Sequence, residues 1–242
     1  MTRRAAAAAG VGIVSAAAWA APALAPISPP VAFALRLPRR FSHGVALTFD
    51  DGPHPEGTPA VLDALGDTKA TFFMVGERVL AAPDVAREVA ARGHIVAVHG
   101  HRHRNLLRLT PAAIARDLDE AHDAIATHTG VSPVLHRAPY GIYSWAALIE
   151  VRRRGWAPIL WSRWGHDWRA RTTPGRIAAE VTRDLRPGDI LLLHDGDDYS
   201  APGSWRNTVA ALPEILTACN RAARTSGAPQ PSPSSAGPPG AP

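Results

Sequence analysis

The sequence predicts an α/β fold in which a barrel of parallel strands is covered by helices. Short apolar runs alternate with helix-like segments between residues 45 and 224, an order typical of a parallel sheet with helices outside. The runs are apolar throughout, as expected for strands buried on both faces. An open doubly wound sheet also fits, but no phosphate-binding glycine fingerprint follows the first strand. Polar clusters follow the first, third and last runs, where barrels carry their chemistry, and this favours the barrel.

The expected strands are short and rich in β-branched and aromatic residues. They cover residues 45–49, 71–75, 95–98, a short segment from Leu135, 159–162 and 190–193.

The expected helices lie between these strands and after the last one. They cover residues 58–65, 84–92, 111–129, 144–154, 173–186 and much of 205–224. The longest has clear end signals, with Thr110 as N-cap, Pro111 at the first helical position and Gly130 after the last turn.

Length and composition indicate one globular domain. The chain has 242 residues, of which 46% are hydrophobic and 19% charged, enough for a core and too few charges for a disordered polyelectrolyte. The formal charge is +5, but the arginines are scattered and not interleaved with aromatics in one patch, so we expect no nucleic-acid partner. Cys219 is the single cysteine, so no intramolecular disulfide can form.

The two ends differ from the middle, and we expect residues 41–224 to form the catalytic domain. Residues 1–40 hold a short basic start, an uncharged alanine-rich run and the small-x-small triplet Ala23-Leu-Ala25, which together indicate export. Pro26 disfavours cleavage there, so the segment is either removed or retained as a membrane anchor; a disordered extension is the alternative. Residues 225–242 are expected to form a flexible Ser/Gly/Pro/Ala tail. The predicted location is extracellular or at the cell surface.

Two adjacent carboxylates follow the first strand. Asp50 and Asp51 precede Gly52 and Pro53. Two carboxylates at the buried mouth of a sheet are costly unless a cation or hydrogen bonds compensate for the charge. The alternative is an ordinary turn, since Asp-Gly-Pro is common turn chemistry.

Three histidines follow the third strand. Imidazoles at i and i+4 share a face if the segment forms a helical turn, which favours His99 with His103 and leaves His101 as an extra potential ligand. Two histidines and one carboxylate make a three-ligand site with open positions, suited to zinc or another divalent first-row metal. The alternative is a solvated basic loop.

Three further segments are weaker signals on their own. Residues 137–141 (Arg-Ala-Pro-Tyr-Gly) could be a plain turn. Residues 161–168 are dense in tryptophan and fit either a sugar-binding wall or a core cluster. His194 ends a buried strand, where a lone histidine is more often structural.

Together the five segments resemble the motifs of the polysaccharide deacetylase family (carbohydrate esterase family 4, the NodB-homology domain). The matching positions, in order, are Thr48-Phe-Asp-Asp-Gly-Pro53, His99-x-x-x-His103, Arg137-x-Pro-Tyr-Gly141, Asp167-Trp168 and Leu192-x-His194. The resemblance runs from about Gly44 to about Leu216. It implies a distorted (β/α) barrel, here with seven repeats. Trp164 departs from the pattern, since many members have an aspartate there.

The resemblance implies a role for each matching position. Asp51, His99 and His103 would bind the metal, with zinc expected and cobalt or another first-row ion as alternatives. Asp50 would be the general base and His194 the general acid.

Five further positions would support these groups. Arg137 would orient Asp50, and Asp167 would orient His194. The backbone N–H of Tyr140 would help to stabilise the oxyanion, and Trp168 and Leu192 would line the acetyl pocket with Tyr140.

The resulting hypothesis is a metal-dependent hydrolase that removes N-acetyl groups from a cell-wall or chitin-like glycan. One alternative keeps the metal site but acts on O-acetyl xylan or a small non-sugar amide. Another is a catalytically silent glycan-binding protein. A glycosidase is disfavoured, because its two carboxylates lie about 5–9.5 Å apart across a sugar, which adjacent residues do not readily provide.

Overall fold

The computed structural model describes residues 19–225, and its centre is a seven-stranded sheet in which every pair of strands is parallel. The strand order is β5-β4-β3-β2-β1-β7-β6. The strands are β1 (Ala46–Asp50), β2 (Thr71–Met74), β3 (Ile95–Val98), β4 (Leu135–His136), β5 (Ala157–Pro158), β6 (Arg163–Trp164) and β7 (Ile190–His194). This arrangement confirms the predicted distorted barrel.

The two edges of the sheet are joined by a segment that is not a strand. Strands β5 and β6 lie at opposite edges of the sheet, and residues 159–162 connect them directly. Within this connection, Ile159 N–H donates to His136 O on β4, and Ser162 N–H donates to Ile190 O on β7. The prediction of a strand at 159–162 was therefore wrong, because this buried apolar segment crosses from one sheet edge to the other.

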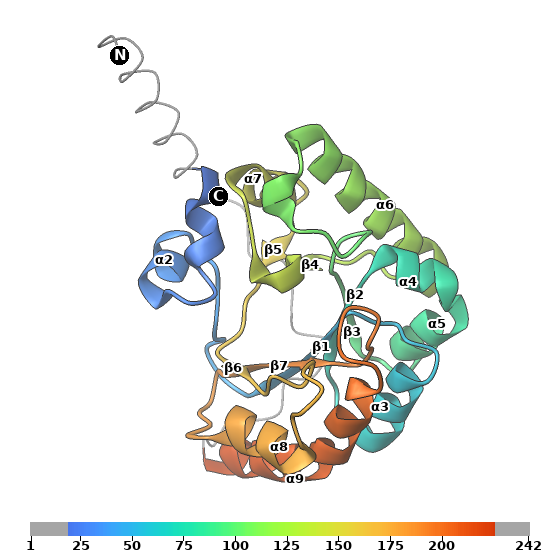
Figure 1. Ribbon diagram of the computed structural model, residues 1–242, viewed down its shortest axis with the longest axis vertical. Coiled ribbons are helices and arrows are strands. Elements are labelled where there is room, and N and C mark those ends of the chain that lie inside the picture. The colour runs from blue at the N-terminus through green and yellow to red at the C-terminus, as the bar shows by residue number, and fades with distance from the viewer. Residues whose placement is uncertain (1–18, 226–242) are drawn as a thin grey trace.

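Helices surround the strands, as Figure 1 shows. They are α3 (Gly57–Leu65), α4 (Gly76–Ala81), α5 (Pro83–Ala91), α6 (Pro111–Thr129), α7 (Trp145–Arg153), α8 (Pro174–Thr182) and α9 (Ser204–Thr225), with short turns η2 (Leu106–Arg108) and η3 (Pro139–Gly141). The predicted caps of α6 are present: Thr110 Oγ1 accepts from Ala113 N–H, and Gly130 is left-handed. Helix α8 ends four residues earlier than predicted, where Asp184 takes a positive φ of 49°. Helix α4 was not predicted.

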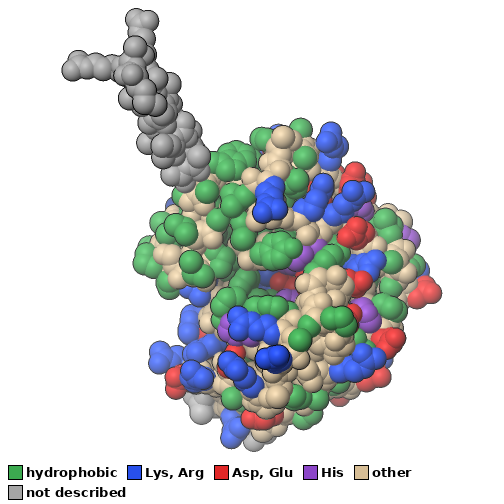
Figure 2. All heavy atoms as spheres, in the orientation of Figure 1, with side chains coloured by type: hydrophobic (Ala, Val, Ile, Leu, Met, Phe, Trp, Pro, Cys, Tyr) green, Lys and Arg blue, Asp and Glu red, His purple; other side chains and the backbone are tan. Residues whose placement is uncertain are grey.

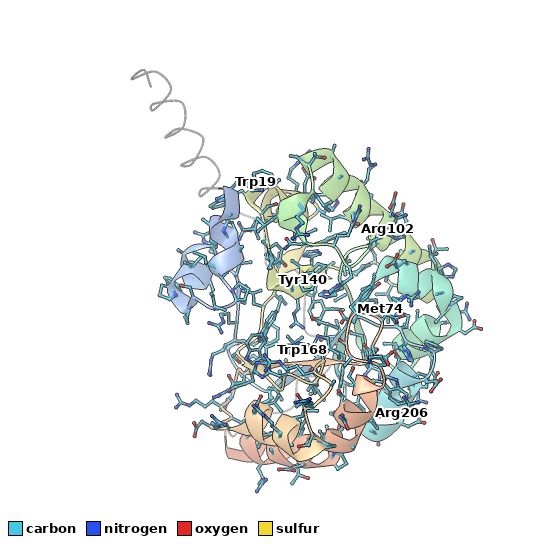
Figure 3. The ribbon with its side chains drawn as sticks, viewed as in Figure 1. Trp19, Met74, Arg102, Tyr140, Trp168 and Arg206 are labelled. Carbon is cyan, nitrogen blue, oxygen red and sulfur yellow. The ribbon has the colours of Figure 1, made fainter. Side chains whose placement is uncertain are left out.

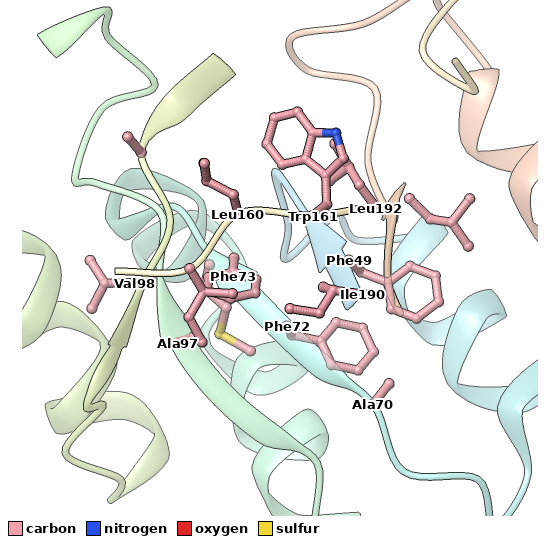
Figure 4. Packing of buried hydrophobic residues seen from close by; sticks show 14 of the residues in the cluster. Phe49, Ala70, Phe72, Phe73, Ala97, Val98, Leu160, Trp161, Ile190 and Leu192 are labelled. Atoms are coloured by element: carbon pink, nitrogen blue, oxygen red, sulfur yellow. The ribbon is translucent and has the colours of Figure 1, made fainter. Parts of the chain in front are cut away.

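The core lies between the sheet and these helices. Figure 4 shows Phe49, Phe72 and Phe73 from the central strands packed with Leu160, Trp161 and Ile190. Phe49 and Phe72 stack at a centroid distance of 5.1 Å. Because the central strands are buried on both faces, their carboxyl ends are the places where polar groups can reach solvent.

Residues 19–40 pack against the barrel. They contain η1 (Ala21–Leu24) and α2 (Pro29–Ala34), and Ala25, Ala32 and Leu37 are buried. Residues 1–18 of the predicted export segment, and nearly all of the predicted tail, lie outside the described residues. Among the residues described, no helix is both long enough and apolar enough to cross a membrane.

Candidate active site

The end of β1 carries two adjacent carboxylates. Asp50 is the last residue of the strand, and Asp51 takes a φ of 81°. A non-glycine residue in this region costs of order 1–3 kcal/mol and persists only where its surroundings hold it. Both residues are buried, with 3% exposure each. Their charges therefore need compensating partners inside the protein.

Asp195 holds the turn after Asp51 in place. Its Oδ1 accepts from Gly52 N–H at 3.1 Å, and its Oδ2 accepts from Thr58 Oγ1 at 2.5 Å. A Cβ on Gly52 would lie 2.2 Å from Asp195 Oδ2, so only glycine fits. Burial raises the pKa of Asp195 to about 7. Asp195 thus stabilises the turn after Asp51 but does not line the cavity described below.

The loop after β3 brings His99 and His103 together. The loop is not helical, but the two imidazoles with i,i+4 spacing still lie in one cluster. The loop is fixed by Asp117 of α6, which accepts from His101 N–H at 2.9 Å and from Arg104 Nη2 at 2.7 Å. The His101 ring points elsewhere: its Nε2 lies 3.8 Å from Glu120 Oε2.

Asp51, His99 and His103 form a cluster suited to a divalent cation. Asp51 Oδ1 lies 3.4 Å from His99 Nε2 and 3.2 Å from His103 Nε2. Ligand atoms about 2.1 Å from a tetrahedral zinc lie about 3.4 Å apart, so the spacing fits. Among the described residues, the buried Asp51 Oδ1 has no hydrogen-bond partner, which is costly unless a cation binds it.

Electrostatics also suit a cation site. Burial raises the pKa of the Asp51 carboxyl, but the neighbouring imidazoles, led by His194, outweigh it and hold that pKa well below its ordinary value. Burial lowers the pKa of His103 to about 4. An ionised carboxylate and a neutral imidazole are the protonation states in which these side chains bind metals.

Arg137 is fully buried and bonds to Asp50. Its Nη1 donates to Asp50 Oδ1 at 2.6 Å and to Thr48 Oγ1 at 2.9 Å, and its Nη2 donates to Leu160 O at 3.1 Å. The guanidinium lies 4.0 Å from the centre of the Phe73 ring. Asp50 is thereby oriented with one oxygen paired, while its Oδ2 lies 3.8 Å from His99 Nε2.

His194 lies beside Asp50 because β1 and β7 pair in register at these two residues. Its Nδ1 lies 2.9 Å from Asp167 Oδ1, and its backbone N–H donates to Asp167 Oδ2 at 2.7 Å. Thr208 Oγ1 of α9 donates to the same Oδ2 at 2.9 Å. Since a carboxylate only accepts, Nδ1 carries the proton in this bond. Burial lowers the pKa of His194, but Asp167 and the nearby aspartates raise it to about 10.

A cavity of about 220 Å³ opens above these groups. Figure 2 shows histidine side chains in a hollow near the centre of one face, and Figure 3 places Tyr140 and Trp168 near the middle of the same view. Tyr140 is 56% exposed, and Trp168 meets the His194 ring edge-on at 5.5 Å. The side chains lining the cavity are those of Asp50, Asp51, His99, His103, Tyr140, Trp161, Trp164, Trp168, Leu192, His194, Tyr199 and Ser200, together with Gly141.

The structure thus brings every predicted lining and metal-binding position to one cavity, with Arg137 and Asp167 directly behind it. Sequence reasoning missed Tyr199 and Ser200. Both lie in the loop after β7, and the available signal was their position beyond the carboxyl end of a barrel strand.

Comparison with known proteins gives consistent matches. Residues 41–158 match the polysaccharide deacetylase family. A chitooligosaccharide deacetylase from Bradyrhizobium sp. (strain ANU 289) is 38% identical over 192 residues, covering 74% of this chain and 86% of that protein. A peptidoglycan-N-acetylglucosamine deacetylase from Bacillus cereus is 35% identical over 176 residues, covering 71% and 79%. The crystal structure of the Bc1960 peptidoglycan N-acetylglucosamine deacetylase has a TM-score of 0.69 at 29% identity, covering 76% of this chain and 83% of that one.

Proposed function

Because this chain belongs to the polysaccharide deacetylase family, we propose that it is a metal-dependent hydrolase that removes N-acetyl groups from a glycan containing N-acetylglucosamine. The observation that carries the proposal is the three-ligand cluster of Asp51, His99 and His103, with a carboxylate and an imidazole beside it in one cavity. Chitin-like oligomers and cell-wall glycan are the two substrate classes that its relatives indicate.

The two groups beside the cluster have complementary tasks. A bound divalent cation would activate water and polarise the amide carbonyl. Asp50 would accept a proton from the attacking water, since Arg137 pairs with one of its oxygens and leaves the other near the cluster. His194 would donate a proton to the departing amine. Its Nδ1–H is bound to Asp167, so its Nε2 is the atom left for this transfer.

The cavity walls account for an acetyl substrate. Leu192 and Trp168 are apolar surfaces next to His194, and a methyl group is stabilised where it meets such surfaces away from water. Tyr140 has a φ of 61° in η3, a strained conformation of the kind that occurs at functional sites. Its backbone N–H would stabilise the oxyanion.

Zinc is the metal we propose, because one carboxylate and two imidazoles are ligands that zinc accepts in catalytic sites; cobalt or another first-row ion would use the same ligands. We also propose that the protein is exported and acts outside the cell or at its surface. The basic and alanine-rich start of the sequence supports export.

Acetate release by the full chain tests the function. Oligomers of N-acetylglucosamine are incubated with the protein as purified, after chelation and after zinc or cobalt is added back. We expect chelation to abolish release and metal to restore it. Acetylated xylan is the comparison substrate, and release from xylan alone would overturn the proposed substrate class.

Two variants separate the chemistry from the metal site. Asp50→Asn should abolish turnover while metal binding is retained, because Asp50 is proposed as the base and not as a ligand. His103→Ala should lose both. Activity like that of the unmodified protein in either variant would refute the assigned roles.

A further inference from the structure

The two histidines of the metal cluster are held in different ways. His99 Nδ1 bonds to Arg137 O at 2.9 Å, which fixes the tautomer and turns Nε2 towards Asp51. Ligating histidines almost always have such a partner on the second ring nitrogen. His103 Nδ1 is buried and has no hydrogen-bond partner in the part of the chain that the structure describes. His103 therefore lacks the protein hydrogen bond that orients His99.

His103 lies between two tyrosine rings. Tyr199 stacks on it at a centroid distance of 4.3 Å and an interplanar angle of 17°. Tyr140 meets it at 4.6 Å and 64°. Tyr140 is 56% exposed, whereas Tyr199 is partly buried and its hydroxyl donates to Glu77 Oε1 at 2.6 Å. The Tyr199 ring is thus the better fixed of the two.

The two residues before Tyr199 anchor its loop to neighbouring segments. Asp198 pairs with Arg78, the residue after Glu77 on α4. Asp197 Oδ1 lies 3.1 Å from His54 Nε2, and Asp197 also accepts from Gly203 N–H. Ring, hydroxyl and loop are therefore placed by contacts independent of His103, so Tyr199 can impose an orientation on it.

We propose that Tyr199 is a positioning residue of the metal site, and that its stacked ring holds the His103 imidazole in the ligating orientation in place of the hydrogen bond that His99 has. This inference rests on the proposed metal site. It concerns the ring of Tyr199, which the loop contacts of Asp197 and Asp198 help to place in addition to the hydrogen bond to Glu77. An imidazole that can rotate freely loses conformational entropy when it binds a metal. Because the stacked ring already restricts the rotation of His103, less entropy is lost on binding.

The test compares metal affinity across matched variants. Tyr199→Leu removes the ring, and we expect it to weaken zinc or cobalt binding by about 10–100-fold, the effect typical of losing an outer-shell partner of a metal ligand. Tyr199→Phe keeps the ring, and we expect a loss of about 3-fold or less. Trp164→Leu is the control, because Trp164 lines the same cavity without a ring contact to His99 or His103.

Affinity is measured by competition with a chromophoric chelator, and the absorption spectrum of bound cobalt reports the ligand geometry. Thermal unfolding in excess chelator shows that each variant is folded; if Tyr199→Leu does not fold, Tyr199→Met provides the comparison without a ring. Metal affinity of the ring-less variant equal to that of the unmodified protein would overturn the inference and leave the metal site intact. An equal loss in Tyr199→Phe would also overturn it, because the hydroxyl would then be responsible. If the unmodified protein binds no metal, the proposed metal site of Asp51, His99 and His103 is itself contradicted.

Discussion

Arg137 is a buried cation whose main partner is Asp50, and Arg137→Met tests whether that pair allows a carboxylate to sit beside the metal cluster. Methionine keeps an unbranched apolar chain against Phe73 and removes the guanidinium. Three hydrogen bonds disappear, including the 2.6 Å bond to Asp50 Oδ1. Asp50, which is 3% exposed, loses its guanidinium partner.

The cost follows from the burial of the pair. Removing one partner of a buried ion pair typically costs about 3–5 kcal/mol. Thr48 Oγ1 keeps its bond to Leu191 O, so the loss of its Arg137 bond adds little. We expect Arg137→Met to lower the free energy of unfolding by about 4 kcal/mol, a large part of the ~5–15 kcal/mol available to a domain. Asp50→Asn in the same chain removes the unpaired charge, so the double variant should recover about 2 kcal/mol or more relative to the sum of the single variants.

Urea unfolding followed by tryptophan fluorescence, in excess chelator, measures all four proteins without a contribution from bound metal. The m-values must agree before the free energies are compared. A free energy of unfolding for Arg137→Met within about 1 kcal/mol of that of the unmodified protein would contradict a stabilising role for the buried pair. So would additivity of the two substitutions within about 0.5 kcal/mol, because residues in one ion pair should couple.

Three other outcomes are expected. Thr208→Val removes one donor to Asp167 Oδ2 and should lower the free energy of unfolding by about 1 kcal/mol. We expect kcat to fall and metal affinity to stay unchanged; an unchanged kcat would contradict a role for Thr208 in supporting Asp167. Zinc at about 100 times its Kd should raise the free energy of unfolding by about 2.7 kcal/mol, and the increase should be absent from His103→Ala; persistence of it there would place the ion elsewhere. Burial lowers the pKa of His94 to about 4. Below pH 6.5 this histidine therefore binds a proton more readily in the unfolded chain than in the folded one. Its contribution to the free energy of unfolding should fall by roughly 3 kcal/mol as the pH drops from 6.5 to 4. His94→Gln should show a shallower decline in urea unfolding over that range, and an identical decline would contradict the assignment.

The sequence was sufficient for the fold class and for most elements of the site. Apolar runs and end signals such as Thr110 and Gly130 act locally, so strands and helices can be predicted from them. Because the carboxyl ends of parallel strands meet at one face, Asp51, His99 and His194 could be expected to lie together. The bridging role of residues 159–162 could not be predicted, since a buried connection and a buried strand have the same apolar pattern.

The order of residues along the chain specifies the chemical groups of the site and the parallel strands that bring them together. The partner of each group depends on contacts between distant segments, which form only in the folded protein. His103 was predicted as a ligand from its spacing to His99, but the stacking of Tyr199 on it depends on how a loop after the last strand is tied to α4. No local pattern encodes a contact between segments so far apart along the chain, because such a contact exists only once the strands between them have paired into the sheet.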